Sequence, residues 1–218
     1  MKLWDYDAFI LDLDGTLIDS GKYHAQAFAD AVFAQSGYVL KPHEHHEFFG
    51  KHSVWFAAVL NERYGLNLDP ESVLKQKRRR VREIFVAELF EGAREFLDFW
   101  KGKTPMALAT NSPLSFVEPA LRDAELLHYF EAITTAGDVK HRKPDPEIIK
   151  ESARRLGVEP PSVLVFEDQL IGIKAARSAG AKVIAVDNGQ PVNYPVDVAV
   201  HTWNDLLKLS ELHRWNPN

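Results

Sequence analysis

The chain has 218 residues, of which 45% are hydrophobic and 26% are charged, and its formal net charge is −5 at pH 7. This composition is typical of a folded globular protein with one large domain, or one domain with an insertion. The negative charge argues against a basic nucleic-acid-binding protein. Because the sequence contains no cysteine, disulfides, thiolate metal sites and a cysteine nucleophile are excluded.

The sequence carries no signal for a membrane or for export. The first seven residues, Met1 to Asp7, include three charges and lack the apolar stretch of a signal peptide. No apolar run approaches the roughly 18–20 residues that a membrane-spanning helix needs. We therefore expect a cytoplasmic protein with no membrane and no nucleic-acid partner, and in the simplest case a monomer.

Short apolar strands and helices alternate along most of the chain. Residues 8–13 form an apolar run that ends at the turn Asp14-Gly15 and is typical of a buried strand. Further strands are expected at 106–109, 132–135, 163–166, 183–186 and 198–200, and helices at 114–124, 146–156 and 172–179. This alternation predicts an α/β fold, a Rossmann-like parallel sheet with helices on both faces.

One stretch contains only helical patterns, at residues 23–35, 54–63 and 70–90. A crossover between two parallel strands needs a single helix, so several helices indicate an inserted helical cap. We expect a core of residues 1–18 and 91–218 and a cap of residues 19–90. Such an insertion would cover the carboxyl ends of the strands, where α/β proteins bind ligands.

The first expected strand ends in Asp12-Leu13-Asp14-Gly15-Thr16. Two carboxylates at a strand end can serve as a nucleophile and a general acid/base. The alternative is a polar strand end followed by an Asp-Gly turn. Asp12 favours function, because a carboxylate within a buried run is costly unless it is paired or bound to a metal.

Polar residues also follow the later strands. Thr110-Asn111-Ser112 comes directly after residues 106–109. Its hydroxyl and amide donors, placed before the start of a helix, could bind a phosphate. The alternative is a simple turn that caps the helix. Lys143 precedes Asp145 and Pro146, which read as the cap and first residue of a helix. Capping does not explain Lys143, whose default interpretation is a surface lysine.

Glu167-Asp168 follows four apolar residues of the strand at 163–166. Adjacent carboxylates without a local cation repel each other, and a divalent cation would relieve that repulsion. Hard oxygen ligands from Asp12 and Asp168 suit Mg²⁺. The sequence therefore predicts Mg²⁺ as the cofactor.

In chain order these segments resemble the four motifs of the haloacid dehalogenase-like hydrolase superfamily. The pattern is Asp-x-Asp-Gly-Thr/Val, a Thr or Ser after the second strand, a Lys, and an acidic pair followed by small residues. The resemblance spans about residues 7–187 and is strongest to sugar-phosphate phosphatases and β-phosphoglucomutases, which carry a helical cap after the first motif. The stretch from Tyr129 to Pro144 looks most like bacterial fructose-1-phosphate phosphatases.

The resemblance implies a Mg²⁺-dependent phosphatase acting on a small phosphate ester. Asp12 would attack phosphorus and form an aspartyl-phosphate, and Asp14 would protonate the leaving oxygen and then activate water. The implied metal ligands are Asp12, the Asp14 carbonyl, Asp168 and, in support, Glu167. The implied phosphate-holding groups are Thr110, the Asn111 amide and Lys143. Gln169 and Leu170 replace the Ser or Ala common after the acidic pair.

The sequence gives less support for substrate-binding residues in the cap than for the four motifs of the core. Lys77 falls in an apolar stripe with Val73 and Val81, and it either contacts substrate or extends along the surface. His24 lies at the expected entrance to the cap. The resemblance to the family also implies a substrate-recognition loop at Gly50 and His52. A group of histidines and glutamates could imitate a metal site, but we expect solvated side chains at His43, Glu44, His45, His46 and Glu47.

Two alternative functions remain open: a sugar-phosphate mutase and a non-catalytic binding module on the same fold. Mutases of this group usually have an arginine after the cap glycine, and no arginine occurs between Gly50 and Glu62. Their first motif also ends in valine rather than in Thr16. Both departures favour hydrolysis, and the presence of Asp14 argues against the dehalogenase branch.

Overall fold

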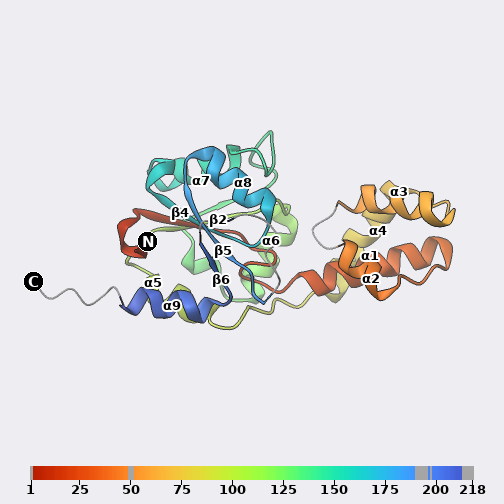
Figure 1. Ribbon diagram of the computed structural model, residues 1–218, viewed down its shortest axis with the longest axis horizontal. Coiled ribbons are helices and arrows are strands. Elements are labelled where there is room, and N and C mark those ends of the chain that lie inside the picture. Colours follow the sequence, from red (N-terminus) through yellow and green to blue (C-terminus); the bar gives the residue numbers. More distant parts are fainter. Residues whose placement is uncertain (1, 49–51, 190–195, 197, 213–218) are drawn as a thin grey trace, which may run out of the picture. The chain divides into compact units, whose positions relative to one another are not determined.

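The computed structural model describes residues 2–48, 52–189, 196 and 198–212. Contacts between residues divide the chain into two compact units, one comprising Met1–Asp19 with Ala87–Asn218 and the other Ser20–Val86. We call the first the core unit and the second the helical unit. The two are described separately below (Figure 1).

The described part of the core unit contains a six-stranded sheet in the order β3-β2-β1-β4-β5-β6, and all paired strands are parallel. The strands are β1 (Ala8–Leu11), β2 (Met106–Ala109), β3 (Ala132–Thr134), β4 (Val163–Glu167), β5 (Lys182–Val186) and β6 (Ala199–Val200). This arrangement confirms the predicted Rossmann-like α/β fold. The strand order reverses between β1 and β4, which is where such sheets bind ligands.

Helices cover both faces of this sheet (Figure 1). They are α5 (Ala93–Trp100), α6 (Leu114–Asp123), α7 (Glu147–Leu156), α8 (Leu170–Ala179) and α9 (Trp203–Leu212), with 3₁₀ turns at Leu3–Asp5, Leu127–Tyr129 and Pro160–Ser162. Alternate residues of β1 point to opposite faces. Ala8 and Ile10 join the buried cluster with α7 and α8, and Phe9 contacts Phe96 and Trp100 of α5.

The helical unit consists, in its described part, of α1 (Gly21–Ser36), α2 (Pro42–Phe48), α3 (Ser53–Tyr64) and α4 (Pro70–Ile84). It has a hydrophobic core of its own, in which Phe28 of α1 packs against Phe56 of α3 and Val73 of α4 is buried. Helix α4 begins where the sequence predicts, because Asp69 caps it and Pro70 occupies its first position.

The predicted helix at residues 70–90 is too long, since α4 ends at Ile84. Residues 85–86 still belong to the helical unit, and the chain then enters the core unit, where Leu89 bridges Ile18 in antiparallel fashion. The backbone N–H of Phe90 donates to the Leu17 carbonyl. This pairing overrides the helical pattern and ties together the two segments that connect the units.

Glu44 is not the solvated residue that the sequence suggests, because its side chain is fully buried. It accepts hydrogen bonds from the Tyr38 hydroxyl and, at 2.7 Å, from the Lys41 backbone N–H. A Glu at the third helical position that reaches back to the cap residue satisfies an otherwise unpaired donor. Glu44 therefore stabilises the start of α2.

No described helix of either unit combines the length and apolarity needed to cross a bilayer.

Candidate active site

Charged and hydroxyl side chains converge at the carboxyl ends of β1, β2 and β4 in the core unit. Asp12 follows β1, and its backbone N–H donates to the Phe166 carbonyl at 3.0 Å, which ties the first motif to β4. Glu167 is the last residue of β4 and Thr110 comes directly after β2. Because these parallel strands are neighbours, residues distant in sequence meet at one edge of the sheet.

Lys143 lies at the centre of this site. Its Nζ donates to Asp12 Oδ1 at 2.6 Å, to Glu167 Oε1 at 2.8 Å and to the Ala109 carbonyl at 2.8 Å. The side chains of Lys143, Asp12 and Glu167 are only 2%, 9% and 3% exposed. Lys143 is therefore a buried ion-pair partner, and the surface-lysine interpretation is wrong.

Burial dominates the electrostatics of the site. It raises the pKa of Asp12 to about 8, because the Lys143 ammonium offsets only part of the cost of desolvation and Glu167 adds repulsion. Burial likewise raises the pKa of Asp168, with repulsion from Glu167 and Asp12. Burial alone would lower the pKa of Lys143, but the Asp12 and Glu167 carboxylates outweigh it and raise that pKa.

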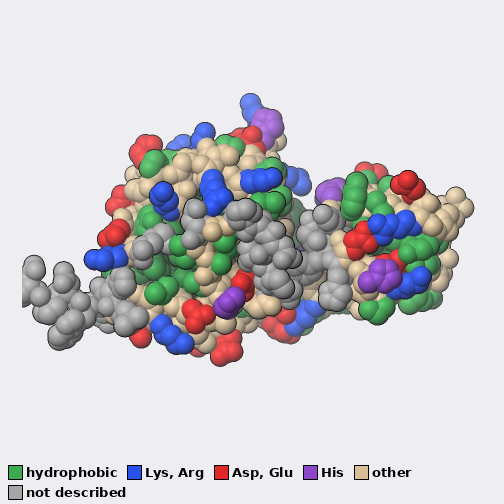
Figure 2. Space-filling model, viewed as in Figure 1, with side chains coloured by type: hydrophobic (Ala, Val, Ile, Leu, Met, Phe, Trp, Pro, Cys, Tyr) green, Lys and Arg blue, Asp and Glu red, His purple; other side chains and the backbone are tan. Residues whose placement is uncertain are grey.

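Asp12, Glu167 and Asp168 could hold a metal ion, because one carboxylate oxygen from each lies within 4.8 Å of the others. Lys143 pairs with both Asp12 and Glu167, so two of these carboxylates share one ammonium when they are ionised. A divalent cation with a preference for hard oxygen ligands fits this donor set. On the face of the molecule shown in Figure 2, by contrast, exposed acidic and basic side chains are interspersed.

Asp14 is held by the segment after β2. The Ser112 hydroxyl donates to Asp14 Oδ2 at 2.6 Å, and the Thr110 hydroxyl is 3.5 Å from the same oxygen. The Ser112 backbone N–H in turn donates to Thr110 Oγ1 at 3.0 Å. The predicted residue Thr110 thus lies beside Asp14, and Ser112, for which the sequence suggested no separate role, makes the shorter contact.

The turn after Asp14 lies against Asp168. The Thr16 hydroxyl donates to Asp168 Oδ1 at 2.8 Å. Gly15 has φ +85°, and a Cβ at this position would be 2.3 Å from Asp168 Oδ2. Glycine is required here both for the left-handed backbone and for the close approach of Asp168.

Asn111 positions Lys143 through its side chain. Asn111 Oδ1 accepts from the Lys143 backbone N–H at 3.0 Å, and Nδ2 donates to the Lys143 carbonyl at 3.2 Å. Both ends of the amide are therefore engaged by the main chain of Lys143. The phosphate contact that the sequence suggests for Asn111 stays a prediction, and its backbone N–H is the group that could make it.

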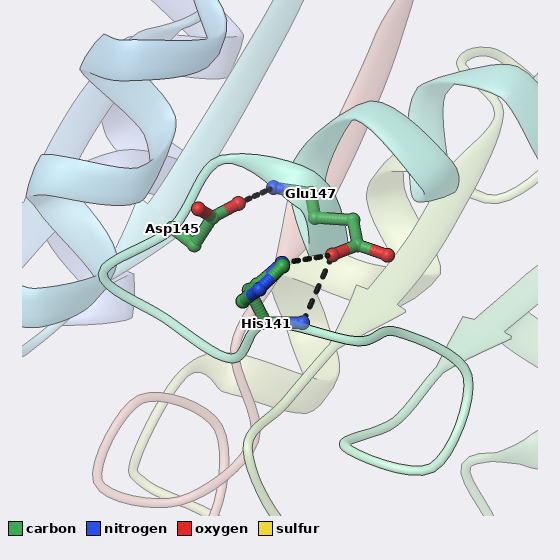
Figure 3. A group of neighbouring side chains, drawn as sticks. All are labelled: His141, Asp145 and Glu147. Carbon is green, nitrogen blue, oxygen red and sulfur yellow. Dashed lines mark hydrogen bonds and ion pairs between the residues drawn. The ribbon is translucent and has the colours of Figure 1, made fainter.

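A second group of possible metal ligands consists of His141, Asp145 and Glu147 (Figure 3). It lies in the loop that carries Lys143 and at the start of the helix that follows. The Glu147 carboxylate accepts from the backbone N–H groups of Lys140 and His141, each at 2.9 Å. Asp145 Oδ1 accepts from the Glu147 N–H, although α7 begins at Glu147, one residue later than predicted. These bonds fix the loop that carries Lys143 and account for the group without a metal.

Glu167 sits over the first turn of α8. Its Oε2 accepts from the Gln169 backbone N–H at 2.8 Å, a bond that any residue other than proline could supply at 169. The departure from the family pattern at Gln169 therefore leaves this contact intact. A Cβ on Gly172 would lie 1.6 Å from Glu167 Oε1, so residue 172 must be glycine for Glu167 to reach Lys143.

We expect Gly172→Ala to displace Glu167 and to lower both the unfolding free energy, by about 1–3 kcal/mol, and kcat. Gly137→Ala is the matched control, because the nearest atom to a Cβ there is 3.7 Å away. Chemical denaturation and steady-state kinetics of both variants check this prediction. Wild-type stability and kcat in Gly172→Ala would contradict the assigned packing.

The predicted substrate-binding residues of the cap lie in the helical unit. His24 and Lys77 are partly buried on α1 and α4, and His52 is exposed at the start of α3. Gly50 falls outside the described residues. Their roles toward substrate stay predictions.

The chain resembles known proteins over most of its length. A family model described as haloacid dehalogenase-like hydrolase matches residues 6–180. The fructose-1-phosphate phosphatase YqaB of Escherichia coli is 32% identical over 182 residues, which cover 83% of this chain and 96% of that protein. A phosphorylated carbohydrates phosphatase of Thermotoga maritima is 33% identical over 181 residues, covering 82% and 83% of the two chains.

A solved structure has the same fold. The haloacid dehalogenase-like protein of Agrobacterium tumefaciens superposes with a TM-score of 0.80 over 96% of this chain and 100% of that one, at 24% sequence identity. The superposition spans the helical unit as well as the core unit. The likeness therefore extends over nearly the whole chain and shows a shared fold.

Proposed function

The chain belongs to the haloacid dehalogenase-like hydrolases, and from this premise we propose that it is a Mg²⁺-dependent phosphatase of a small phosphorylated metabolite, with Asp12 as nucleophile. The observation that carries the proposal is the buried cluster in which Lys143 bonds both Asp12 and Glu167. One carboxylate oxygen of Asp168 lies within 4.8 Å of an oxygen of each of these two residues, so the three could hold one metal ion. Folding gains little from desolvating so many charges, which argues for a catalytic purpose.

In the first step a carboxylate oxygen of Asp12 attacks phosphorus. A bond forms between that oxygen and phosphorus, and the bond from phosphorus to the substrate oxygen breaks. Asp14 gives its proton to the departing oxygen. The Ser112 hydroxyl, 2.6 Å from Asp14 Oδ2, holds the carboxyl group in one orientation for this transfer.

In the second step water attacks the phosphorus of the aspartyl-phosphate. Asp14, now ionised, takes a proton from the water, the bond from phosphorus to Asp12 breaks, and inorganic phosphate leaves. Asp14 regains its proton, so the pair returns to its starting state. Two carboxylates with separate roles thus divide one difficult displacement into two easier ones.

Asp12, Asp168, the Asp14 carbonyl and, in support, Glu167 would hold Mg²⁺. When bound, the ion supplies positive charge that lowers the repulsion between a carboxylate nucleophile and an anionic phosphate. Lys143 supplies a fixed cation from the protein itself. We assign Lys143, Thr110 and the backbone N–H of Asn111 to the phosphoryl oxygens, where donors fixed in advance stabilise the redistributed charge.

Phosphorylated sugars are the substrate class that we propose. The support is that two relatives covered over more than four fifths of their length are named for fructose 1-phosphate and for phosphorylated carbohydrates. We further propose that the helical unit acts as a cap that selects the substrate, with His24, Lys77 and the segment around Gly50 and His52 as its contacts.

A substrate screen tests the proposal and its mutase alternative. The purified protein is incubated with Mg²⁺ and hexose, pentose, gluconate and glycerol phosphates, and released phosphate is measured. Glucose 1-phosphate with its bisphosphate is the mutase control. We expect Mg²⁺-dependent phosphate release from at least one sugar phosphate. Interconversion of glucose phosphates without phosphate release would favour a mutase, and inactivity throughout would favour a binding module.

We expect Mg²⁺ to raise the melting temperature more at pH 8 than at pH 6. Burial raises the pKa of Asp12 to about 8, from 3.8 for an exposed aspartate, so without metal the folded protein keeps a proton on Asp12 through the neutral range. The stability from this proton is present at low pH and is lost as pH rises through the raised pKa. Mg²⁺ needs the ionised carboxylate and competes with the proton.

Thermal unfolding with and without saturating Mg²⁺ at the two pH values measures the effect. The Asp12→Asn variant is the control, and its Mg²⁺ shift should depend less on pH because one competing proton is gone. An equal Mg²⁺ shift at pH 6 and pH 8 in the wild type would contradict the assignment of Asp12 as a ligand.

A further inference from the structure

Asn188 reaches from the loop after β5 to the turn that carries the proposed acid/base. Its side-chain Nδ2 donates to the Gly15 carbonyl at 2.8 Å and to the Thr16 carbonyl at 3.1 Å. These two carbonyls belong to the residues immediately after Asp14. One amide group from a distant part of the sequence thus holds the backbone of the first motif from outside the four motifs.

The same turn receives a third donor. Trp203, the first residue of α9, donates from Nε1 to the Thr16 carbonyl at 2.8 Å. Its indole is fully buried, with ring centroids 5.0 Å from Phe96 and 5.6 Å from Phe166. The donor on the Trp203 ring is therefore fixed by the hydrophobic core and anchors the Thr16 carbonyl, whereas Asn188 bonds the Gly15 carbonyl as well.

The described residues on either side of Asn188 make hydrogen bonds of their own. Asp187 Oδ1 accepts from the Gly189 N–H at 2.9 Å, and His201 Nδ1 lies 2.9 Å from Asp187 Oδ2. Asn188 has φ 48°, in the left-handed region, which few residues other than glycine, Asn and Asp adopt readily.

The turn needs such support because of its composition. Gly15, with φ +85°, is the most flexible kind of residue, and it links Asp14 to Thr16, whose hydroxyl bonds Asp168. Movement of this turn would displace Asp14 and Asp168 together. A misplacement of about 1 Å can cost about a hundredfold in rate. Hydrogen bonds that fix the Gly15 and Thr16 carbonyls therefore affect the rate of the reaction.

We propose that Asn188 is a positioning residue for the reaction, acting through its two hydrogen bonds to the Gly15 and Thr16 carbonyls to hold Asp14 in place. The inference rests on the proposed function of Asp14. Asn188 and Trp203 both lie beyond residues 6–180, the part of the chain that the family model matches. Asn188, which lies two residues after the end of β5, is therefore assigned a part in catalysis in addition to its part in the fold.

Two substitutions remove the donors while keeping the backbone. Asn188→Gly deletes the side chain, and glycine adopts a positive φ without strain. Asn188→Asp keeps the shape and the tolerance for this conformation, but replaces the donor by an oxygen facing two carbonyl oxygens. Asn67→Gly is the matched control, because Asn67 also has a positive φ of 55° and belongs to the helical unit.

Steady-state kinetics on the Mg²⁺-loaded enzyme give the first readout. We expect both Asn188 variants to lose about ten- to a hundredfold in kcat while KM changes less than about twofold, since Lys143 and Thr110 still hold the phosphate. Asn67→Gly should retain wild-type values. A merely structural role would lower the melting temperature and leave kcat per folded molecule unchanged, and that result overturns the inference.

Hydrogen exchange gives a second readout that does not depend on activity. We expect faster amide exchange in the peptide containing residues 13–18 in both Asn188 variants, and wild-type exchange in Asn67→Gly. Wild-type exchange of this peptide in the Asn188 variants overturns the inference. If the wild type releases no phosphate from any ester, the proposed function fails, and exchange alone then decides whether Asn188 holds the turn. If the wild type is active and the Asn188 variants keep its kcat, the inference fails alone.

Discussion

Asp12→Asn is expected to abolish Mg²⁺-dependent phosphate release, with kcat lower by at least about a thousandfold. An amide oxygen is a poor nucleophile toward phosphorus, and the substitution also removes a proposed metal ligand. The measurement is phosphate release from a generic aryl phosphate and from the best sugar phosphate of the substrate screen. Asp123→Asn, at an exposed position of α6, is the matched control and should behave as the wild type.

Loss of activity in Asp12→Asn cannot be attributed to unfolding if the account is right. Asparagine has the shape of aspartate, and its neutral amide avoids the cost of burying a charge where burial raises the pKa of the carboxyl group to about 8. Lys143 keeps its contact with Glu167 at 2.8 Å. The variant should therefore melt, in the absence of Mg²⁺, at or above the wild-type temperature. Full activity in this variant would refute the nucleophile assignment.

Lys143→Met should be the second severe substitution, and it should affect both activity and stability. Removing one member of a buried ion pair destabilises proteins by about 3–5 kcal/mol because it leaves uncompensated charge. We expect a loss of this size at pH 9 in the absence of Mg²⁺. At pH 6 the loss should be smaller, because Asp12, whose pKa burial raises to about 8, is protonated there with or without Lys143. We expect kcat to fall by about a hundredfold or more.

Denaturant titrations at the two pH values and steady-state kinetics check this prediction. Lys150→Met is the control, because Lys150 is an exposed lysine of the neighbouring helix α7 and should tolerate the change. A Lys143→Met protein with wild-type kcat would contradict the proposed contact with phosphate. A stability loss independent of pH would contradict the charge balance that we assign to the cluster.

The sheet could be predicted because its strands are short, apolar and bounded by turn residues. Residues 106–109 match β2, and the predicted strand at residues 163–166 differs from β4 only by Glu167. Helices were harder to recognise where charged residues interrupt the apolar pattern or where the helix is short. Helices α2, α5 and α9 were not predicted from the sequence, although α5 buries Phe96, Leu97 and Trp100.

The site was predictable where side chains follow strands directly, because parallel strands bring their carboxyl ends together. This rule associates Asp12, Thr110 and Glu167, which the structure places at the carboxyl ends of three neighbouring strands. It says nothing of contacts that depend on loop conformation. The bond from Ser112 to Asp14 and the Asn111 side chain on the Lys143 main chain arise from turns whose backbone geometry no periodicity encodes.

Asn188 and Trp203 could not be found from the sequence for a related reason. They follow β5 and β6 and lie more than 170 residues from the Gly15–Thr16 turn, and their residue types are not restricted to catalytic sites. The direction of the Asn188 side chain follows only from the fold. Tertiary pairing also accounts for the end of α4, where residues 88–90 run beside residues 17–19.

The most direct test of the account is to trap the phosphorylated enzyme. The wild-type protein is mixed with Mg²⁺ and excess substrate, quenched in acid within one turnover, digested and analysed by mass spectrometry. We predict one added phosphoryl group on the carboxylate of Asp12, dependent on Mg²⁺ and absent from Asp12→Asn. A phosphoryl group on another residue, or turnover at the full rate in which the protein is never labelled, would contradict the central claim that Asp12 is the nucleophile.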